Sequence, residues 1–119
     1  MSKHVLVVFT NAVEGQDEEF NDWYDRVHIP DLLNIPEIKS AQRFRLSGAQ
    51  KMPPPYAWRY MALYEIETDD LSKVISIIKE RAGTPLMPLT DTLQPERIGW
   101  YFDTISSPVA ASALQHSSR

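Results

Sequence analysis

Residues 20–33 read FNDWYDRVHIPDLL, and this stretch carries the most informative local pattern in the chain. Its apolar side chains recur at i, i+3, i+4 and i+7, the spacing of one buried stripe on a helix: Phe20, Trp23, Tyr24 and Val27. Ile29 precedes Pro30, and the residue before a proline is disfavoured in the α region. We therefore predict that the first helix ends near Val27 and that a second short helix starts at Pro30, with His28 in the joint.

His28 falls on the edge of this stripe, half buried and half reachable, with Asp25 and Asp31 close enough to orient its ring. A half-buried imidazole beside carboxylates is expected to have a pKa near neutral and to carry a substrate proton. Tyr24, one turn earlier, could donate a proton or hydrogen-bond a carbonyl oxygen. Both are the candidate catalytic residues, although a histidine at a helix end can also cap the last carbonyls and a tyrosine can belong to the core.

Outward from this stretch, the pattern predicts four strands and two helices in the order β-α-β-β-α-β. The predicted strands are His4–Asn11, Ile38–Leu46, Arg59–Glu67 and Arg97–Ile105. The first helix follows Gly15; the second is capped by Asp69 or Asp70 and ended by Gly83. This order predicts an α+β, ferredoxin-like fold, with one four-stranded antiparallel sheet and two helices on one face. We expect residues 1–105 to form a single domain and residues 106–119 a tail.

The face of the sheet that the two helices leave open is expected to be apolar. On the first strand, Leu6 and Val8 point one way, and Val5, Val7 and Phe9 point the other way. The fourth strand likewise places Ile98, Trp100 and Phe102 opposite Tyr101 and Ile105. An exposed sheet face of this kind calls for a partner, and the simplest is a second copy packed sheet against sheet. The sequence therefore predicts a homodimer.

Composition narrows the classes of function. The 119 residues carry a formal net charge of −4 and no cysteine, which argues against nucleic acid and excludes disulfides and thiolate chemistry. With no apolar run of membrane-spanning length and no secretory leader pattern, we expect a cytoplasmic protein without a membrane partner. The three histidines, His4, His28 and His116, are too dispersed for a metal site, and no glycine pattern cradles a phosphate. We expect no cofactor.

Six further side chains are candidates for binding a small-molecule substrate: Asn11, Trp23, Arg43, Tyr60, Tyr64 and Trp100. Asn11 ends the first strand, where its amide could polarise a carbonyl, although asparagine there often serves a turn. Arg43 and Arg45 share a face of the second strand, and an arginine directed into an apolar cavity binds a carboxylate; at least one of the two is expected to be a surface residue. The aromatic side chains are expected to line a cavity or the core. His4 is a weak candidate.

Residues 3–105 resemble the dimeric α+β barrel superfamily, and the segment EFNDWYDRVHIPDLLNIPEIKSAQRF is similar to the first-helix region of its EthD-like members. The resemblance implies a fold and a dimer but no one activity, since the superfamily includes cyclases, isomerases, quinol monooxygenases and haem-degrading enzymes. KHVLVVF, with His4, resembles the start of the plant polyketide cyclases, which also use a histidine beyond the second helix; here residues 29–115 contain none. Nothing between Leu71 and Gly83 can ligate iron, so haem is not expected.

The leading hypothesis is a cofactor-independent isomerase or cyclase that transfers a proton next to a carbonyl of a small oxygenated compound derived from an aromatic, or of a carboxylated ring-cleavage product. His28 would carry the proton, Tyr24 and Asn11 would stabilise the enolate oxygen, and Arg43 would hold a carboxylate. One alternative is a cofactorless quinol monooxygenase, which oxygen consumption would reveal. The other is a non-catalytic binding or stress protein, in which replacing His28 would change neither turnover nor ligand affinity.

Overall fold

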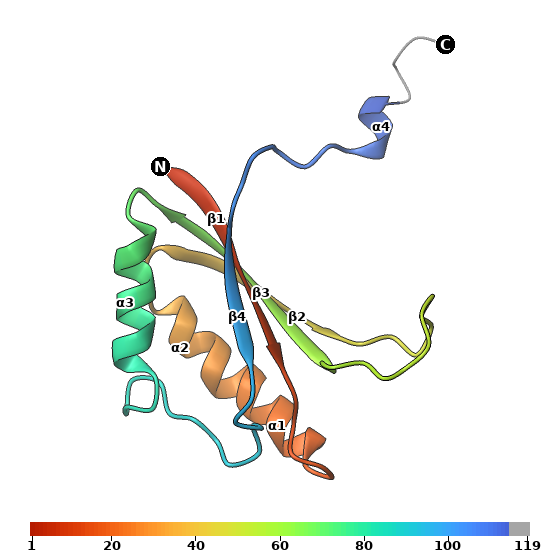
Figure 1. Ribbon diagram of the computed structural model, residues 1–119. Coiled ribbons are helices and arrows are strands. Elements are labelled where there is room, and N and C mark those ends of the chain that lie inside the picture. Colours follow the sequence, from red (N-terminus) through yellow and green to blue (C-terminus); the bar gives the residue numbers. More distant parts are fainter. Residues whose placement is uncertain (115–119) are drawn as a thin grey trace.

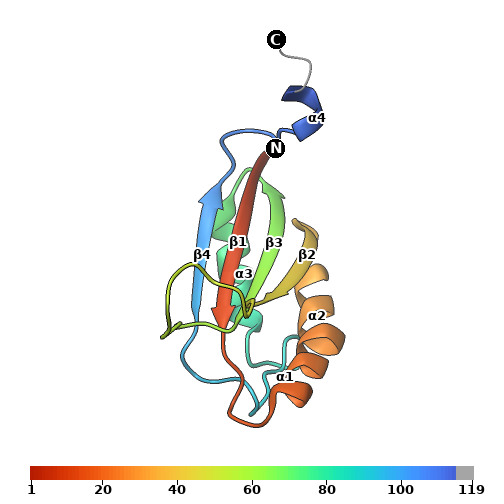
Figure 2. The same ribbon diagram turned by 90° about the vertical axis from the view of Figure 1, so that its right-hand side faces the viewer.

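The computed structural model describes residues 1–114 and shows one four-stranded sheet in the order β2-β3-β1-β4. The elements are β1 (Ser2–Thr10), α1 (Asp17–Trp23), a π-helical turn (Tyr24–His28), α2 (Ile29–Leu33), β2 (Ile38–Arg45), β3 (Tyr60–Thr68), α3 (Leu71–Arg81), β4 (Ile98–Asp103) and α4 (Ala111–Leu114). Every strand pair is antiparallel. The segment from α1 to α2 and the helix α3 lie on the same side of the sheet (Figures 1 and 2). The ferredoxin-like α+β fold predicted from the sequence is confirmed.

The helix is not broken before Pro30, contrary to the prediction. Ile29 has φ −59° and ψ −50°, so it stays in the α region. The chain widens instead into a π turn over Tyr24–His28, and the N–H of Ile29 bonds the carbonyl of Tyr24, five residues back. A proline inside a helix lacks an N–H and crowds the preceding turn, and one extra residue per turn accommodates both defects. His28 is the last residue of this turn.

The other boundaries differ from the predictions by one or two residues. β1 begins at Ser2 rather than His4, because the register with β3 continues to the pair Ser2 and Thr68. α3 begins after Asp70, whose carboxylate accepts a hydrogen bond from the N–H of Lys73 at 3.2 Å. Gly83 has φ +81°, a left-handed conformation that suits glycine beyond a helix end.

Strand register separates the side chains into a helix-covered face and an open face. Leu6 pairs with Tyr64 on β3 and with Tyr101 on β4, so these three residues share the covered face. Alternate residues of β3 point to this face, and all five of them are buried: Tyr60, Ala62, Tyr64, Ile66 and Thr68. On the open face, Trp100 and Phe102 remain 54% and 50% exposed. The apolar open face expected from the sequence is therefore present.

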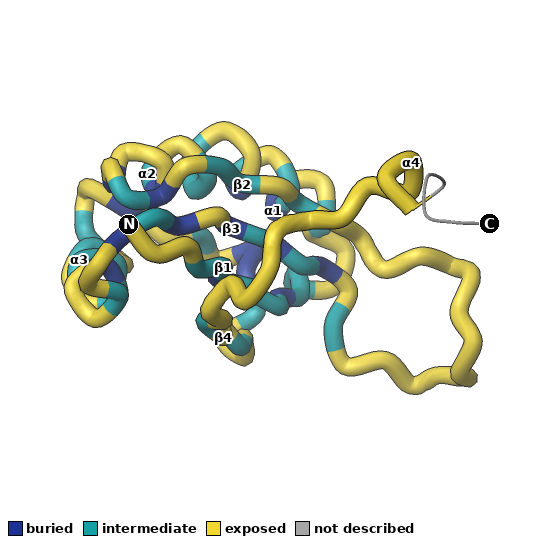
Figure 3. The backbone as a smooth tube through the Cα atoms, turned by 90° about the horizontal axis from the view of Figure 1, so that it is seen from above, coloured by how far each residue is buried: buried dark blue, intermediate teal, exposed yellow. Residues whose placement is uncertain are grey.

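Two segments extend away from the sheet. The β2–β3 connection carries the three consecutive prolines and loops outward, closed at its base by a hydrogen bond from Leu46 N–H to the Arg59 carbonyl at 2.7 Å (Figure 1). After β4 the chain runs away from the sheet to the single turn α4, and both segments are largely exposed (Figure 3). His116 lies outside the described residues. Over the part of the chain that the structure describes, no helix has the length and apolar character needed to span a membrane.

Candidate functional site

A cavity of about 150 Å³ lies between the helices and the covered face of the sheet. The π turn, β1, β3, α3 and the segment before β4 all contribute to its wall: Val8, Thr10, Trp23, Tyr24, His28, Leu32, Tyr64, Ile78, Ala82, Met87, Leu89, Leu93 and Arg97. Apolar side chains dominate, with a few polar groups among them, as in small-molecule sites. Four of the eight residues proposed from the sequence meet here, namely His28, Tyr24, Trp23 and Tyr64.

The His28 ring is clamped between two aromatic side chains. It stacks on Trp23 with the ring centroids 4.7 Å apart and meets the edge of Tyr24 at 5.0 Å. The indole N–H of Trp23 in turn donates to the carbonyl of Pro88 at 3.2 Å. Nδ1 of His28 is buried without a hydrogen-bond partner, and Nε2 has none within residues 1–114. The ring is thus held by packing, and neither of its nitrogens forms a hydrogen bond with a described residue.

The electrostatics of His28 differ from the expectation of a near-neutral pKa. Burial, assisted by the positive charges of Arg97 and Arg43, lowers the pKa of His28 to about 4. The neighbouring carboxylates do not offset this effect. Asp25 pairs instead with Arg43, and Oδ2 of Asp31 is buried without a partner. His28 is therefore a neutral imidazole at pH 7.

Tyr24 and Tyr64 bring two phenol groups to the same cavity. Burial raises the pKa of both hydroxyls, and each lies in the field of the other. The Tyr64 hydroxyl nevertheless has no hydrogen bond of good geometry, although it is completely buried. An unsatisfied buried hydroxyl costs stability and is often found where a ligand is bound. Both phenols stay protonated at neutral pH and can donate hydrogen bonds.

Arg43 lies on the covered face but is held by other side chains outside the cavity. Its guanidinium donates to Asp25 at 2.9 Å and to Asn21 at 2.7 Å, and its Cζ sits 4.3 Å from the centroid of the Tyr24 ring. These contacts fix α1 and the π turn against β2. Arg43 thus packs against the ring of Tyr24 and does not line the cavity.

Asn11 and Tyr60 hold loops and helices in place. The Asn11 side chain donates to the carbonyl of Ala57 at 2.9 Å and accepts from the N–H of Arg59 at 2.8 Å, which closes the long β2–β3 connection. The Tyr60 hydroxyl donates to Asp17 at the start of α1. Neither side chain lines the cavity.

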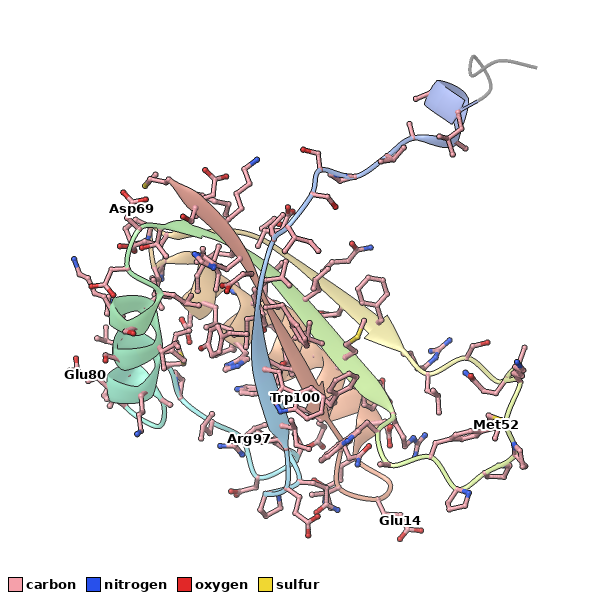
Figure 4. The ribbon with its side chains drawn as sticks, turned by 45° about the horizontal axis from the view of Figure 1, so that its top comes forward. Glu14, Met52, Asp69, Glu80, Arg97 and Trp100 are labelled. Carbon is pink, nitrogen blue, oxygen red and sulfur yellow. The ribbon has the colours of Figure 1, made fainter. Side chains whose placement is uncertain are left out.

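Trp100 and His4 are also remote from it. Trp100, labelled in Figure 4, belongs to the open face and meets Phe9 edge-on at 6.1 Å. His4 borders a larger hollow of about 500 Å³ near the end of β4, but its ring nitrogens are engaged with Asp103 at 2.8 Å and with the carbonyl of Thr68 at 3.3 Å. Residues 1–114 contain no group of three or more histidine or acidic side chains that could bind a metal.

Arg97 is the site residue that the sequence analysis missed. It directly precedes the first residue of β4, follows a proline-rich crossing, and lines the same cavity as His28. Figure 4 labels it near the lower end of β4. Alternation along the fourth strand places residue 97 on the same face as Gly99 and Tyr101, so the pattern contained a signal. An arginine at a strand end is usually a surface residue, and only the packing of residues 84–96 shows that this one borders a cavity.

Comparison with known proteins supports the fold and leaves the activity open. No family model matches the chain. A curated relative, Core atranone cluster (CAC) protein 1 of the fungus Stachybotrys chlorohalonatus, is 33% identical over 61 residues, covering 51% of this chain and 23% of that protein. The chain thus spans about a quarter of its relative's length.

Two solved structures are similar to the chain at low sequence identity, and the first of them supports its architecture. A dimeric ferredoxin-like protein of unknown function from Thermobifida fusca has a TM-score of 0.51 and 10% identity, over 87% of this chain and 92% of the other. HapK from Hahella chejuensis has a TM-score of 0.47 and 14% identity, over 93% of this chain and 99% of its own. With the strand order above, the first match shows that this chain has the ferredoxin-like α+β fold.

Proposed function

We propose that this protein is a cofactor-independent isomerase or cyclase that transfers a proton next to a carbonyl of a small oxygenated compound. The observation that carries the proposal is the cavity itself, where an uncommitted imidazole faces two protonated phenols within apolar walls. A proton acceptor and hydrogen-bond donors to an oxygen are the parts that enolisation requires.

The proposed step begins with neutral His28. Nε2 takes a proton from the carbon next to the substrate carbonyl, and the electron pair of that C–H bond moves to form the enolate. The hydroxyls of Tyr24 and Tyr64 donate hydrogen bonds to the enolate oxygen. The imidazolium then returns the proton to another carbon or to oxygen, so the step is balanced and needs no oxidant.

The protonation states support these roles. The low pKa of His28 keeps the imidazole unprotonated at neutral pH, although it also makes the imidazole a weak base, and the raised pKa values of Tyr24 and Tyr64 keep both donors protonated. Pairs of groups whose environments separate their pKa values are typical of acid–base sites. Tyr64 takes the role that the sequence analysis gave to Asn11.

The fungal relative is consistent with a substrate of this kind, since its name connects it with an atranone cluster. That name gives no reaction. The substrate class therefore rests on the cavity, which is small and mostly apolar, with aromatic side chains in its wall.

Phenylpyruvate is a suitable probe because it combines a ketone, a carboxylate and an aromatic ring. The assay follows incorporation of deuterium from D₂O at the carbon next to the ketone by ¹H NMR. We expect exchange above the buffer rate with the wild type and at least about a hundredfold less with His28→Gln. His4→Gln is the matched control, because it replaces a histidine outside the cavity.

Equal rates of deuterium exchange with the wild type, with His28→Gln and in buffer alone would contradict the proposal. Oxygen uptake with a hydroquinone, dependent on His28, would instead favour the monooxygenase alternative.

We also propose that the chain forms a homodimer through its open face. Phe44, Trp100 and Phe102 on that face are 38%, 54% and 50% exposed, and a monomer rarely leaves such a patch uncovered. The similar Thermobifida fusca protein is dimeric. Sedimentation should give a dimer for the wild type and for Leu86→Glu, which alters an exposed leucine in the crossing before β4, but a monomer for Trp100→Glu.

A further inference from the structure

A groove of about 300 Å³ lies between α3 and β4, next to the cavity that contains His28. Its wall is formed by Leu6, Val8, Ile75, Ile78, Lys79, Arg97, Ile98, Gly99 and Tyr101. Val8, Ile78 and Arg97 line both spaces. The two spaces therefore adjoin, and a molecule longer than the cavity could continue into the groove past Arg97.

The charges of this region have one sign. Arg97 and Lys79 are the ionised side chains among the lining residues, and no aspartate or glutamate lines either space. Within the described residues, neither cation forms an ion pair or a hydrogen bond. In a chain with a formal net charge of −4, an acid-free groove with two unpaired cations is a local exception. An anionic group of a ligand would supply the missing partner for these two cations.

We infer that the groove between α3 and β4 is a binding site for the anionic end of an elongated apolar substrate, such as an aryl carboxylate, with Arg97 as the residue that selects for the negative charge. The inference rests on the proposed function, because it places the reacting carbonyl beside His28 and the carboxylate beside Arg97.

The position of Arg97 also explains how an anion would act on the base. Trp23 and Tyr24, from its own helical segment, contact the His28 ring, and Tyr64 from β3 lines the same cavity. The cations that act on His28 are Arg43 of β2 and Arg97, which directly precedes β4. A carboxylate on Arg97 neutralises one of the charges that disfavour the imidazolium. Binding of an anionic substrate should then make His28 a stronger base.

A pair of probes that differ in charge tests the inference. 1-Naphthoate and its uncharged amide, 1-naphthamide, share one aromatic body, and their dissociation constants are measured by calorimetry at low salt. The wild type should bind the carboxylate about tenfold more tightly than the amide. Arg97→Met should remove this preference while keeping affinity for the amide, which also shows that the variant is folded. Lys79→Met should reduce the preference in part.

Lys73→Met is the matched control, because Lys73 is an exposed cation of α3 that lines neither space. It should keep the full preference. In addition, naphthoate should shift the ¹³C-edited NMR signals of His28, identified with His28→Gln. Equal affinities of the wild type for the two probes would overturn the inference. An unchanged preference in Arg97→Met, an equal loss in Lys73→Met, or binding that leaves the His28 signals in place would do the same.

These outcomes are separate from those of the proposed function. Charge-selective binding at Arg97 without His28-dependent exchange would refute the proposed reaction and leave the binding site intact. His28-dependent exchange without a preference for the carboxylate would refute the binding site at Arg97 and leave the proposed reaction intact.

Discussion

The burial of a neutral histidine predicts that this protein loses stability in mild acid through His28. The pKa of His28 is about 4 in the folded chain, against about 6.5 in an unfolded one. Between these values the unfolded state binds the proton and the folded state does not, so the free energy of unfolding decreases as the pH falls from 6.5 towards 4. At about 1.4 kcal/mol per pKa unit, the loss between pH 7.5 and pH 4.5 is about 2.5 kcal/mol.

The assay is urea unfolding of the wild type and of His28→Gln at pH 7.5 and pH 4.5, at one protein concentration so that any association contributes equally. Glutamine does not titrate, so the variant should lose about 2.5 kcal/mol less than the wild type over this interval. Other groups affect both proteins alike and cancel in the difference. Equal losses in the two proteins, or a His28 NMR titration with a pKa near 6.5, would refute the reasoning.

Four further substitutions test separate parts of the account. Arg97→Met should raise the pKa of His28, measured by NMR, and the effect should shrink in high salt because Arg97 is exposed. Tyr64→Phe removes a hydroxyl whose contact with Tyr24 is not a hydrogen bond of good geometry, so the free energy of unfolding should stay within about 1 kcal/mol of the wild type, while deuterium exchange falls about a hundredfold. Tyr60→Phe should do the opposite, costing about 1 kcal/mol through the lost bond to Asp17 and leaving exchange unchanged. Asp70→Ala should cost about 1 kcal/mol in urea unfolding without any effect on exchange, since it removes the cap of α3.

Much of the fold could be predicted because each element carries its own local pattern. The stripe from Phe20, the alternation of β1 and β3, and the cap at Asp70 each depend on neighbours in the sequence. The π turn could not be predicted in this way. The rule for residues before proline is a preference, and Ile29 stays in the α region because the chain widens into a π turn there.

The site was predictable where it lies on one helix and less so where it depends on distant segments. His28, Tyr24 and Trp23 lie within six consecutive residues of one helical segment, so their spacing alone brought them together. Asn11 and Arg43 have the chemistry of binding residues, but Ala57, Arg59, Asp25 and Asn21 occupy them, and partners so far away in the sequence leave no local signal.

The central claim is that the cavity beside His28 is where the substrate binds. Its most direct test is to titrate the wild type with phenylpyruvate while recording the histidine ring signals by NMR. We predict that the His28 signals shift progressively to saturation and those of His4 do not. Saturable binding of phenylpyruvate that leaves the His28 signals unmoved would contradict the account.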